Sequence, residues 1–268
     1  MNESLSKERL IYLRRQKRKK LIIIFSRIAL LILLIGMWEL LAQLKIINTF
    51  ITSSPSRVAA CFLRLIKDGT LFLHLSTSVY ETLAGFLIGT VLGLAIAVIL
   101  WLSDYVCKVL EPYLVILNAL PKVALGPVII VWAGAGTGSI IIMTLAISLI
   151  VTTLEVLNAF LSTDRQKVLL LKTMGATKRQ ILQKCILPSN LKSIISSMKV
   201  NIGLSWVGVI MGEFLVSKAG LGYLITYGSQ VFQMDLVMTS VILLAICATA
   251  MYELINLSEK LILKKVRL

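Results

Sequence analysis

Residues 162–192 read STDRQKVLLLKTMGATKRQILQKCILPSNLK and form the only long polar interruption between the apolar runs of the second half of the chain. The stretch holds seven Lys or Arg against one acid, Asp164. Apolar residues recur in it at helical spacing, while Gly175 interrupts the pattern and Pro188 closes it, which predicts a short helix, a turn and a second short helix. A loop this long with internal structure indicates a docking surface for a cytoplasmic partner. The alternative is a solvated basic loop that only fixes the topology.

The composition predicts an all-α membrane protein that crosses the lipid bilayer several times. Hydrophobic residues make up 57% of the 268 residues and charged residues 15%, and the mean hydropathy is +0.90. In soluble domains, hydrophobic residues average about 45–50% and charged residues about 25%. The formal charge of +15 lies mainly in the tails and one loop, as expected for cytoplasmic segments, so we expect no nucleic-acid partner. Four scattered cysteines and the single His74 predict neither a disulfide framework, a metal site nor a cofactor.

The N-terminal part divides into three predicted segments. Residues 1–20 form a basic tail, and residues 21–44 form an apolar run that exceeds the roughly 7–15 residues of a signal peptide, so we expect a first transmembrane helix. Residues 45–80 are predicted to be extracytoplasmic. Within them, a Ser-Pro start signal and one apolar face predict an amphipathic helix on the membrane surface that ends at Gly69.

Residues 81–258 are predicted to form a core of five further transmembrane helices. The second span, 82–103, has no charge and carries glycines four residues apart, which predicts close helix packing. Residues 123–154 would form a helix of about 48 Å, longer than the roughly 30 Å hydrocarbon core, so spans three and four must meet in a turn at 134–139. Pro121 and Pro127 should distort span three. Spans five and six are expected at 194–216 and 236–257, before a basic tail at 259–268.

The distribution of basic residues predicts the orientation. Twenty of the 28 Lys and Arg lie in four segments: the N-terminal tail, the expected turn at 103–111, the 162–192 loop and the C-terminal tail. Cytoplasmic segments of membrane proteins are enriched in Lys and Arg, so we expect all four segments on the cytoplasmic side. Six spans place both termini on the same side. We therefore expect a multi-pass protein of the bacterial cytoplasmic membrane with both termini in the cytoplasm.

The sequence contains no set of residues for covalent chemistry. It lacks a Ser/His/Asp set, an HExxH motif, a nucleotide-binding loop and paired carboxylates within one span, so we predict no catalytic residue and no enzymatic activity. Energy for transport would then come from a gradient or from another subunit. The acids counted within the apolar runs lie mostly near span ends, which weighs against a proton or sodium relay: Glu39, Glu155, Glu213 and Glu253.

The sequence resembles the transmembrane permease subunits of binding-protein-dependent ABC importers, in the branch for nitrate, sulfonates and taurine. The family's cytoplasmic signature is Glu-Ala-Ala, three residues, Gly, nine residues and Ile-x-Leu-Pro; Gly175 and residues 185–188 match it in register. Leu169 to Leu171 stand in place of Glu-Ala-Ala, so no glutamate is present there to make an ionic contact with the ATPase. Further similar stretches lie at 53–58, 117–139 and 212–225, so the resemblance covers about residues 50–260.

The resemblance implies a MetI-like permease fold with six transmembrane helices. It also implies two ATPase subunits, an extracytoplasmic substrate-binding protein and a second permease copy as partners. In this family the 162–192 loop would be a coupling helix in a groove of the ATPase, with contacts from Leu169, Leu170, Leu171, Lys172, Met174, Gly175, Ala176, Lys178, Arg179, Leu187 and Pro188.

Two further sets of residues are candidates for the transport route. Candidates for the pathway lining are Asn118, Lys122, Trp132, Asn201, Ser205 and Trp206. The Lys122 charge either faces a polar cavity or extends to the interface, and the two tryptophans could instead be interfacial or packing aromatics. The predicted gate region comprises Glu213, Gly220 and Gly222.

The resemblance favours a small anion or organic solute, such as a sulfonate, nitrate or taurine, as substrate. The alternative substrate is a vitamin-like heterocycle, a pyrimidine or flavin precursor. Two other functions stay open: a gradient-driven secondary transporter, which would show internal repeats and a buried acid relay, and a membrane scaffold without transport activity.

Overall fold

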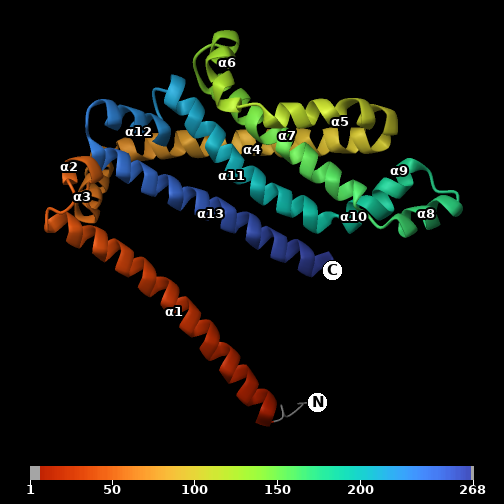
Figure 1. The fold of residues 1–268 in the computed structure, drawn as a ribbon, viewed down its shortest axis with the longest axis horizontal. Helices are drawn as coiled ribbons and strands as arrows, with labels where there is room; N and C mark the ends of the chain where they lie inside the picture. Colours follow the sequence, from red (N-terminus) through yellow and green to blue (C-terminus); the bar gives the residue numbers. More distant parts are fainter. Residues whose placement is uncertain (1–6, 267–268) are drawn as a thin grey trace.

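The computed structural model describes residues 7–266, which form helices and turns and no strand (Figure 1). The ends of the predicted tails, residues 1–6 and 267–268, lie outside the described residues. The elements are α1 Lys7–Gln43, α2 Thr49–Thr52, α3 Pro55–Lys67, α4 Thr70–Leu102, α5 Asp104–Ala119, η1 Lys122–Leu125, α6 Gly126–Ala133, α7 Thr137–Leu161, α8 Arg165–Thr173, α9 Lys178–Ile181, η2 Leu182–Ile186, α10 Leu187–Ser189, α11 Leu191–Val216, α12 Leu221–Gln230 and α13 Met234–Val266.

Five of these helices are long and apolar enough to cross a membrane by themselves. They are α4, α7, α11, residues 21–43 of α1 and residues 234–264 of α13. A sixth span is present if α5 and the η1–α6 segment are counted together, although these two pieces meet at an angle of 87°. The all-α membrane fold predicted from composition is therefore confirmed.

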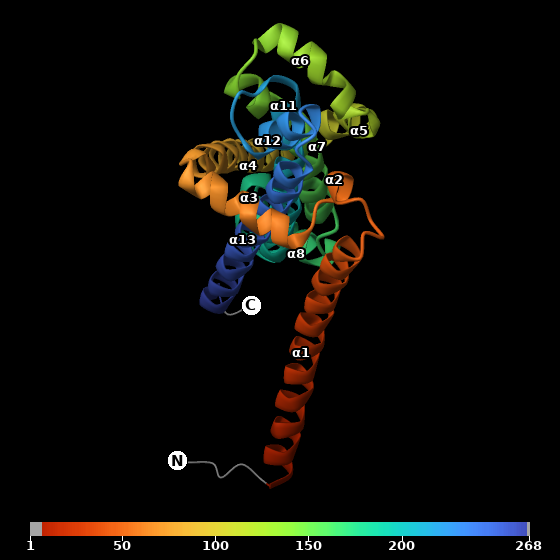
Figure 2. The same cartoon turned by 90° about the vertical axis from the view of Figure 1, so that its left-hand side faces the viewer.

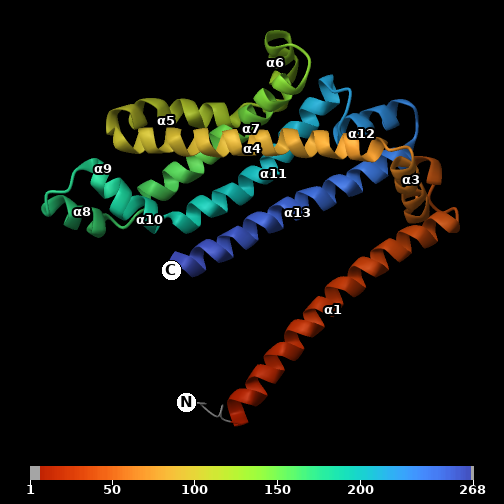
Figure 3. The same cartoon turned by 180° about the vertical axis from the view of Figure 1, so that it is seen from behind.

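The third span is not the continuous helix that the apolar run suggested. The expected turn at 103–111 is wrong, because α5 begins at Asp104 and folds back along the last turns of α4 (Figure 3). The chain then bends at Leu120, whose ψ of 139° is extended. A residue that precedes proline avoids the helical region, so Pro121 imposes this bend. The predicted distortion of span three is confirmed.

The boundaries of the neighbouring spans are only partly as predicted. The turn expected at 134–139 is present, with left-handed backbone at Gly134 (φ 79°) and Gly136 (φ 146°). The second span, by contrast, begins at Thr70 rather than at residue 82, because no helix breaker separates residues 70 and 82 once Gly69 has ended α3. Residues 70–80 therefore belong to α4.

The centre of the molecule is a tight contact among α4, α7 and α11. Gly85, Gly89 and Gly93 of α4 lie against side chains of α7 that are also four residues apart, namely Thr144, Ser148 and Thr152. The α11 helix approaches the same residue of α7, because a Cβ atom at Gly208 would lie 2.5 Å from the Thr144 Cα atom. The predicted close packing of the α4 glycines is thus confirmed, and α7 is the helix they approach.

The first helix lies largely apart from this core. The α1 helix projects away from the other helices and approaches them only near its C-terminal end, next to α3 (Figure 2). There the Glu39 carboxylate accepts hydrogen bonds from the Ser56 amide (3.0 Å) and hydroxyl (2.9 Å), and so caps the start of α3.

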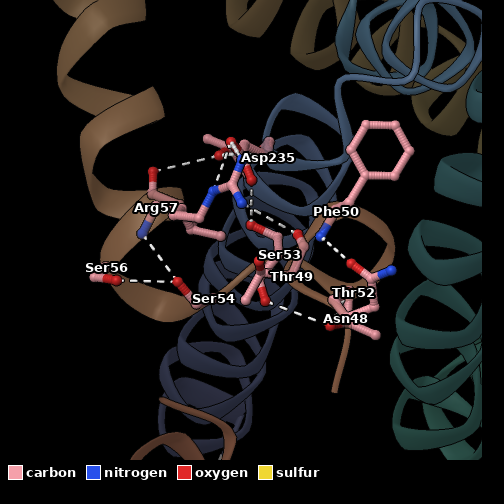
Figure 4. Close-up of polar contacts among 11 residues, drawn as sticks. Asn48, Thr49, Phe50, Thr52, Ser53, Ser54, Ser56, Arg57 and Asp235 are labelled. Atoms are coloured by element: carbon pink, nitrogen blue, oxygen red, sulfur yellow. Dashed lines mark hydrogen bonds and ion pairs between the residues drawn. The ribbon is translucent and has the colours of Figure 1, made fainter. Parts of the chain in front are cut away.

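A second polar contact ties α3 to the start of α13 (Figure 4). The Arg57 guanidinium forms an ion pair with Asp235 at 2.9 Å, and the Ser53 hydroxyl donates to the same carboxylate at 2.7 Å. The Ser54 hydroxyl caps α3 by accepting from the Arg57 amide. These contacts fix the surface helix α3 across the end of the bundle where α12 also lies (Figure 1).

The α7–α11 contact makes a testable prediction. Gly208→Ala should lower the free energy of unfolding by about 1–3 kcal/mol, because the added methyl overlaps the α7 backbone. Gly203→Ala on the same helix is the matched control, since nothing lies within 4 Å of a Cβ atom there. Thermal unfolding of both variants in detergent, followed by tryptophan fluorescence, checks the prediction; equal midpoints would contradict the tight contact.

Candidate functional site

The predicted site residues lie at two opposite ends of the bundle. The 162–192 loop, with α8, α9 and α10, occupies the end where α5 begins, which we call the α8 end (Figures 1 and 3). The gate residues lie at the other end, which we call the α12 end. The long helices α4, α7 and α11 run between the two ends.

The 162–192 loop has the helix–turn–helix structure that its sequence predicted. The Asp164 carboxylate caps α8 by accepting from the Gln166 amide at 2.9 Å. Gly175 has a φ of 80°, the left-handed conformation that glycine adopts without strain. The second helix starts with a capping box in which Thr177 and Gln180 bond each other's backbone amides.

The prediction that Pro188 ends the second helix is wrong. The helical backbone continues through η2, a π-helical segment, into α10, and Pro188 occupies one of the first positions of α10. The Leu187 amide bonds the Leu182 carbonyl, five residues back. This wider turn accommodates the proline, which lacks an N–H and would clash with the carbonyl four residues before it in a regular α-helix.

One half of the loop is anchored in the protein and the other half is exposed. The η2 region buries its apolar side chains against α4, α5 and α7, in a cluster formed by Ala97, Leu100, Cys107, Val156, Leu157, Phe160, Ile181, Leu182, Cys185 and Ile186. In α8 and the following turn, by contrast, Leu169 is 60% exposed, Leu170 61% and Met174 73%. The loop therefore exposes three large apolar side chains in one half while its other half is packed against the membrane helices.

The basic residues of the loop divide in the same way. The Lys178 ammonium lies 3.1 Å from the Asp104 carboxylate and bonds the Leu102 carbonyl at 3.3 Å, so it joins the loop to the α4–α5 junction. The side chains of this ion pair are 49% and 79% exposed, so its contribution to stability is small. The basic residues Lys172 and Arg179 are exposed.

The other predicted contact residues of the loop differ in exposure. Pro188 is exposed, and the half-buried ones are Leu171, Ala176 and Leu187.

The predicted pathway residues fall into two groups. At the bend after α5, the Lys122 ammonium bonds the Asn118 carbonyl (2.9 Å) and side-chain oxygen (3.3 Å), while Trp132 of α6 is 83% exposed. Asn201, Ser205 and Trp206 are instead buried in α11. The Asn201 amide donates to Thr90 of α4 at 2.7 Å. Pathway lining stays a prediction for all six residues.

The structure brings the three predicted gate residues together at the α12 end. The Glu213 carboxylate accepts hydrogen bonds from the Gly222 amide and from the Ser78 hydroxyl of α4, both at 2.5 Å. The Ser78 hydroxyl accepts in turn from the Leu221 amide at 2.7 Å. A Cβ atom at Gly220 would overlap the Glu213 carboxyl group. The start of α12 is thus fastened to α4 and α11 around one buried acid.

Sequence reasoning missed the partners of Glu213 on α4. Glu81 is 1% exposed, and its carboxyl group lies close enough to that of Glu213 to interact directly. His74, one turn before Ser78, accepts from the Gly220 amide at 3.1 Å. The sequence did contain a signal, namely the directions of the two helices. Because α4 and α11 run antiparallel, the start of α4 lies at the same end of the bundle as the finish of α11. Glu81, in the first half of α4, can therefore meet Glu213, near the end of α11.

Comparison with known proteins identifies the family. The family model described as "Binding-protein-dependent transport system inner membrane component" matches residues 89–268. The chain belongs to this family. It is therefore an ABC importer permease, a multi-pass membrane component that works with an ATPase and a binding protein and is not itself the ATPase.

Individual relatives are similar over most of their length. The putative aliphatic sulfonates transport permease SsuC of Bacillus subtilis is 27% identical, over 86% of this chain and 84% of its own. The riboflavin transport system permease RibX of Chloroflexus aurantiacus is 29% identical, over 87% of each chain. A solved MetNI methionine ABC transporter in an inward-facing conformation superposes with a TM-score of 0.63 at 19% identity, over 72% of this permease and 94% of that chain. The expected MetI-like fold is confirmed.

The contact of Glu213 with the turn before α12 makes a second prediction. Glu213→Ala leaves the Gly222 amide and the Ser78 hydroxyl without their acceptor, so amide hydrogen exchange in residues 217–224 should accelerate at least about tenfold. Glu253→Ala, at an exposed acid of α13, should leave that exchange unchanged. Equal exchange in the two variants would show that Glu213 does not hold the turn.

Proposed function

We propose that the 162–192 loop of this permease is its coupling element, through which ATP-driven movement of the ATPase reaches the membrane helices. The observation that supports this role is the exposed apolar group Leu169, Leu170 and Met174 on a loop whose other half is anchored against α4 and α7. An apolar centre with a charged rim suits a protein interface, and Lys172 and Arg179 provide the rim. Because Leu169–Leu171 replace the family's Glu-Ala-Ala, we infer that the seating in the ATPase is mainly apolar.

The anchored half of the loop suggests how force would pass to the helices. The segments from α9 to α10 lead directly into α11, interrupted only at Asn190, and their buried side chains pack on α4 and α7. A displacement of the loop would therefore move three spans together as a rigid body. Alternating inward- and outward-open states would follow when two such units rock against each other.

A second copy of this chain is the partner that we propose for the α5–α6 region. Trp132 and Val131 of α6 are more than four-fifths exposed, and Tyr105 and Tyr113 of α5 are also exposed. Large aromatic side chains that the rest of the same chain leaves uncovered are typical of an interface core. We propose a homodimer whose translocation pathway lies between the two copies, served by two ATPase subunits.

We propose a small organic solute as the substrate, either a sulfonate-like anion or a vitamin-like heterocycle. The relatives named above include permeases for aliphatic sulfonates and for riboflavin, at similar identity. A gradient-driven transporter and a non-transporting scaffold are disfavoured by membership of a binding-protein-dependent family.

The coupling role predicts the effect of one substitution. Leu170→Asp should weaken co-purification of the ATPase subunit at least tenfold, because a carboxylate replaces an apolar contact worth about 2 kcal/mol at an interface. Ile46→Asp is the matched control, since Ile46 is 66% exposed and lies in the turn after α1, outside the loop and outside the candidate membrane spans. Thermal stability of the permease should be unchanged in both variants. Normal ATPase binding by Leu170→Asp would contradict the proposed seating.

The proposed orientation, with both termini and the α8 end in the cytoplasm, predicts a labelling pattern. Ser162→Cys should resist a membrane-impermeant maleimide in intact cells and react in inverted vesicles, whereas Thr70→Cys should show the reverse. Both positions are exposed, and the unsubstituted chain, whose four cysteines are buried or half-buried, gives the background. Labelling of Ser162→Cys from outside would place the loop on the wrong side for an ATPase.

A further inference from the structure

A cavity of about 380 Å³ lies beside the two facing glutamates at the α12 end. It is bounded by the first half of α4, the turn between α6 and α7, and the turn between α11 and α12. Its polar and charged side chains are Thr77, Glu81, Thr137, Ser217 and Lys218. The volume falls within the range of about 300–1,000 Å³ that small-molecule sites occupy.

The Glu81 carboxyl group has bonding capacity that the protein leaves unused. Its side chain is 1% exposed and lies within hydrogen-bonding reach of Thr137 and Glu213, but its Oε2 atom accepts no hydrogen bond from an N–H or O–H donor of residues 7–266. The neighbouring Glu213 differs, because an amide and a hydroxyl donate to it. A buried carboxylate oxygen without a donor is costly, so Glu81 favours a donor group that enters the cavity it lines.

The charges around the cavity point to the kind of donor. Two carboxyl groups face each other there, and Lys218 is the one basic side chain in the lining. His74 is an acceptor for the Gly220 amide through Nδ1, which leaves that nitrogen unprotonated. At least one carboxyl group therefore lacks a positive partner. Either a proton or a bound cation provides the missing positive charge, since two buried carboxylates in contact do not both stay charged without compensation.

We propose that this cavity binds the protonated amine of a small solute on its way through the permease, with the Glu81 carboxylate as the acceptor. The inference rests on the proposed transport function and narrows its substrate class. An ammonium group carries three N–H donors, and the hydroxyls of Thr77, Thr137 and Ser217 add acceptors next to Glu81. Lys218 favours an anionic group in the same solute, so a zwitterion fits the cavity better than a simple anion does.

Protection of Glu81 from a carbodiimide tests this site without knowledge of the transported solute. The complex of permease and ATPase in lipid nanodiscs is treated with a hydrophobic carbodiimide, which converts a carboxyl group to an N-acylurea, and the peptide that contains Glu81 is quantified by mass spectrometry. The treatment is repeated with methylammonium chloride, tetramethylammonium chloride or sodium chloride at equal ionic strength. Glu111, an exposed acid of α5, serves as the internal control.

Methylammonium should lower the modification of Glu81 at least fivefold with a saturable dependence, while sodium and tetramethylammonium, which have no N–H donors, leave it unchanged. Modification of Glu111 should be the same in all three salts. The proposal is overturned if Glu81 does not react, if no salt protects it, or if sodium or tetramethylammonium protects it as well as methylammonium does. Protection by sodium alone would assign the cavity to an inorganic cation.

The same samples separate this inference from the coupling role. Retention of the ATPase in the nanodisc complex reports on the α8 end, at the other end of the bundle from Glu81. An intact complex without methylammonium protection overturns only the amine site. Loss of the ATPase, with Glu81 still protected, contradicts only the proposed docking of the coupling loop.

Discussion

The close approach of α4, α7 and α11 is the constraint on which the rest of this permease depends. In lipid, burial of apolar surface does not drive helices together, so contact relies on small residues that let the backbones meet. The glycines of α4 and the Thr and Ser residues of α7 recur with the same period of four, and they face each other along the shared length. The remaining helices pack around this unit or extend from it.

This central unit links the two ends of the molecule. The α4 helix spans 33 residues, about 50 Å. Near its start, His74, Ser78 and Glu81 meet the turn before α12, and near its end Ala97 and Leu100 seat the anchored half of the basic loop. A single rigid element therefore contacts both the proposed coupling element and the predicted gate. The same arrangement holds for α11, which begins next to the loop at Leu191 and carries Glu213 near its end at Val216.

The sequence predicted those features whose signals are local and failed where the decisive contact joins distant segments. Composition specified the helical membrane class, and Gly175 specified the turn in the loop through its own backbone. The four-residue glycine spacing predicted a close contact but did not identify α7 as its partner. The sequence did not reveal the role of Glu81, because acids were considered within one span at a time and its partner Glu213 belongs to another helix.

Proline positions were informative about distortion and misleading about helix ends. Pro121 bends the chain, as expected, because the residue that precedes a proline avoids the helical conformation. Pro188 has the same chemistry, yet the helical path continues because the π-helical turn of η2 widens just before it. Which outcome occurs depends on packing: the side chains of η2 are buried against α4 and α7, and this burial stabilises an otherwise unfavourable turn.

The π-helical turn also sets the direction in which the exposed half of the loop faces. Such a turn contains one residue more than the α-helical path would need. In a regular α-helix an inserted residue would rotate everything on one side of it by about 100° around the axis. The wider turn of η2 takes up the extra residue locally, so the segments on its two sides keep their relative direction. The facing of Leu169, Leu170 and Met174 therefore depends on a local widening of the backbone in a neighbouring segment.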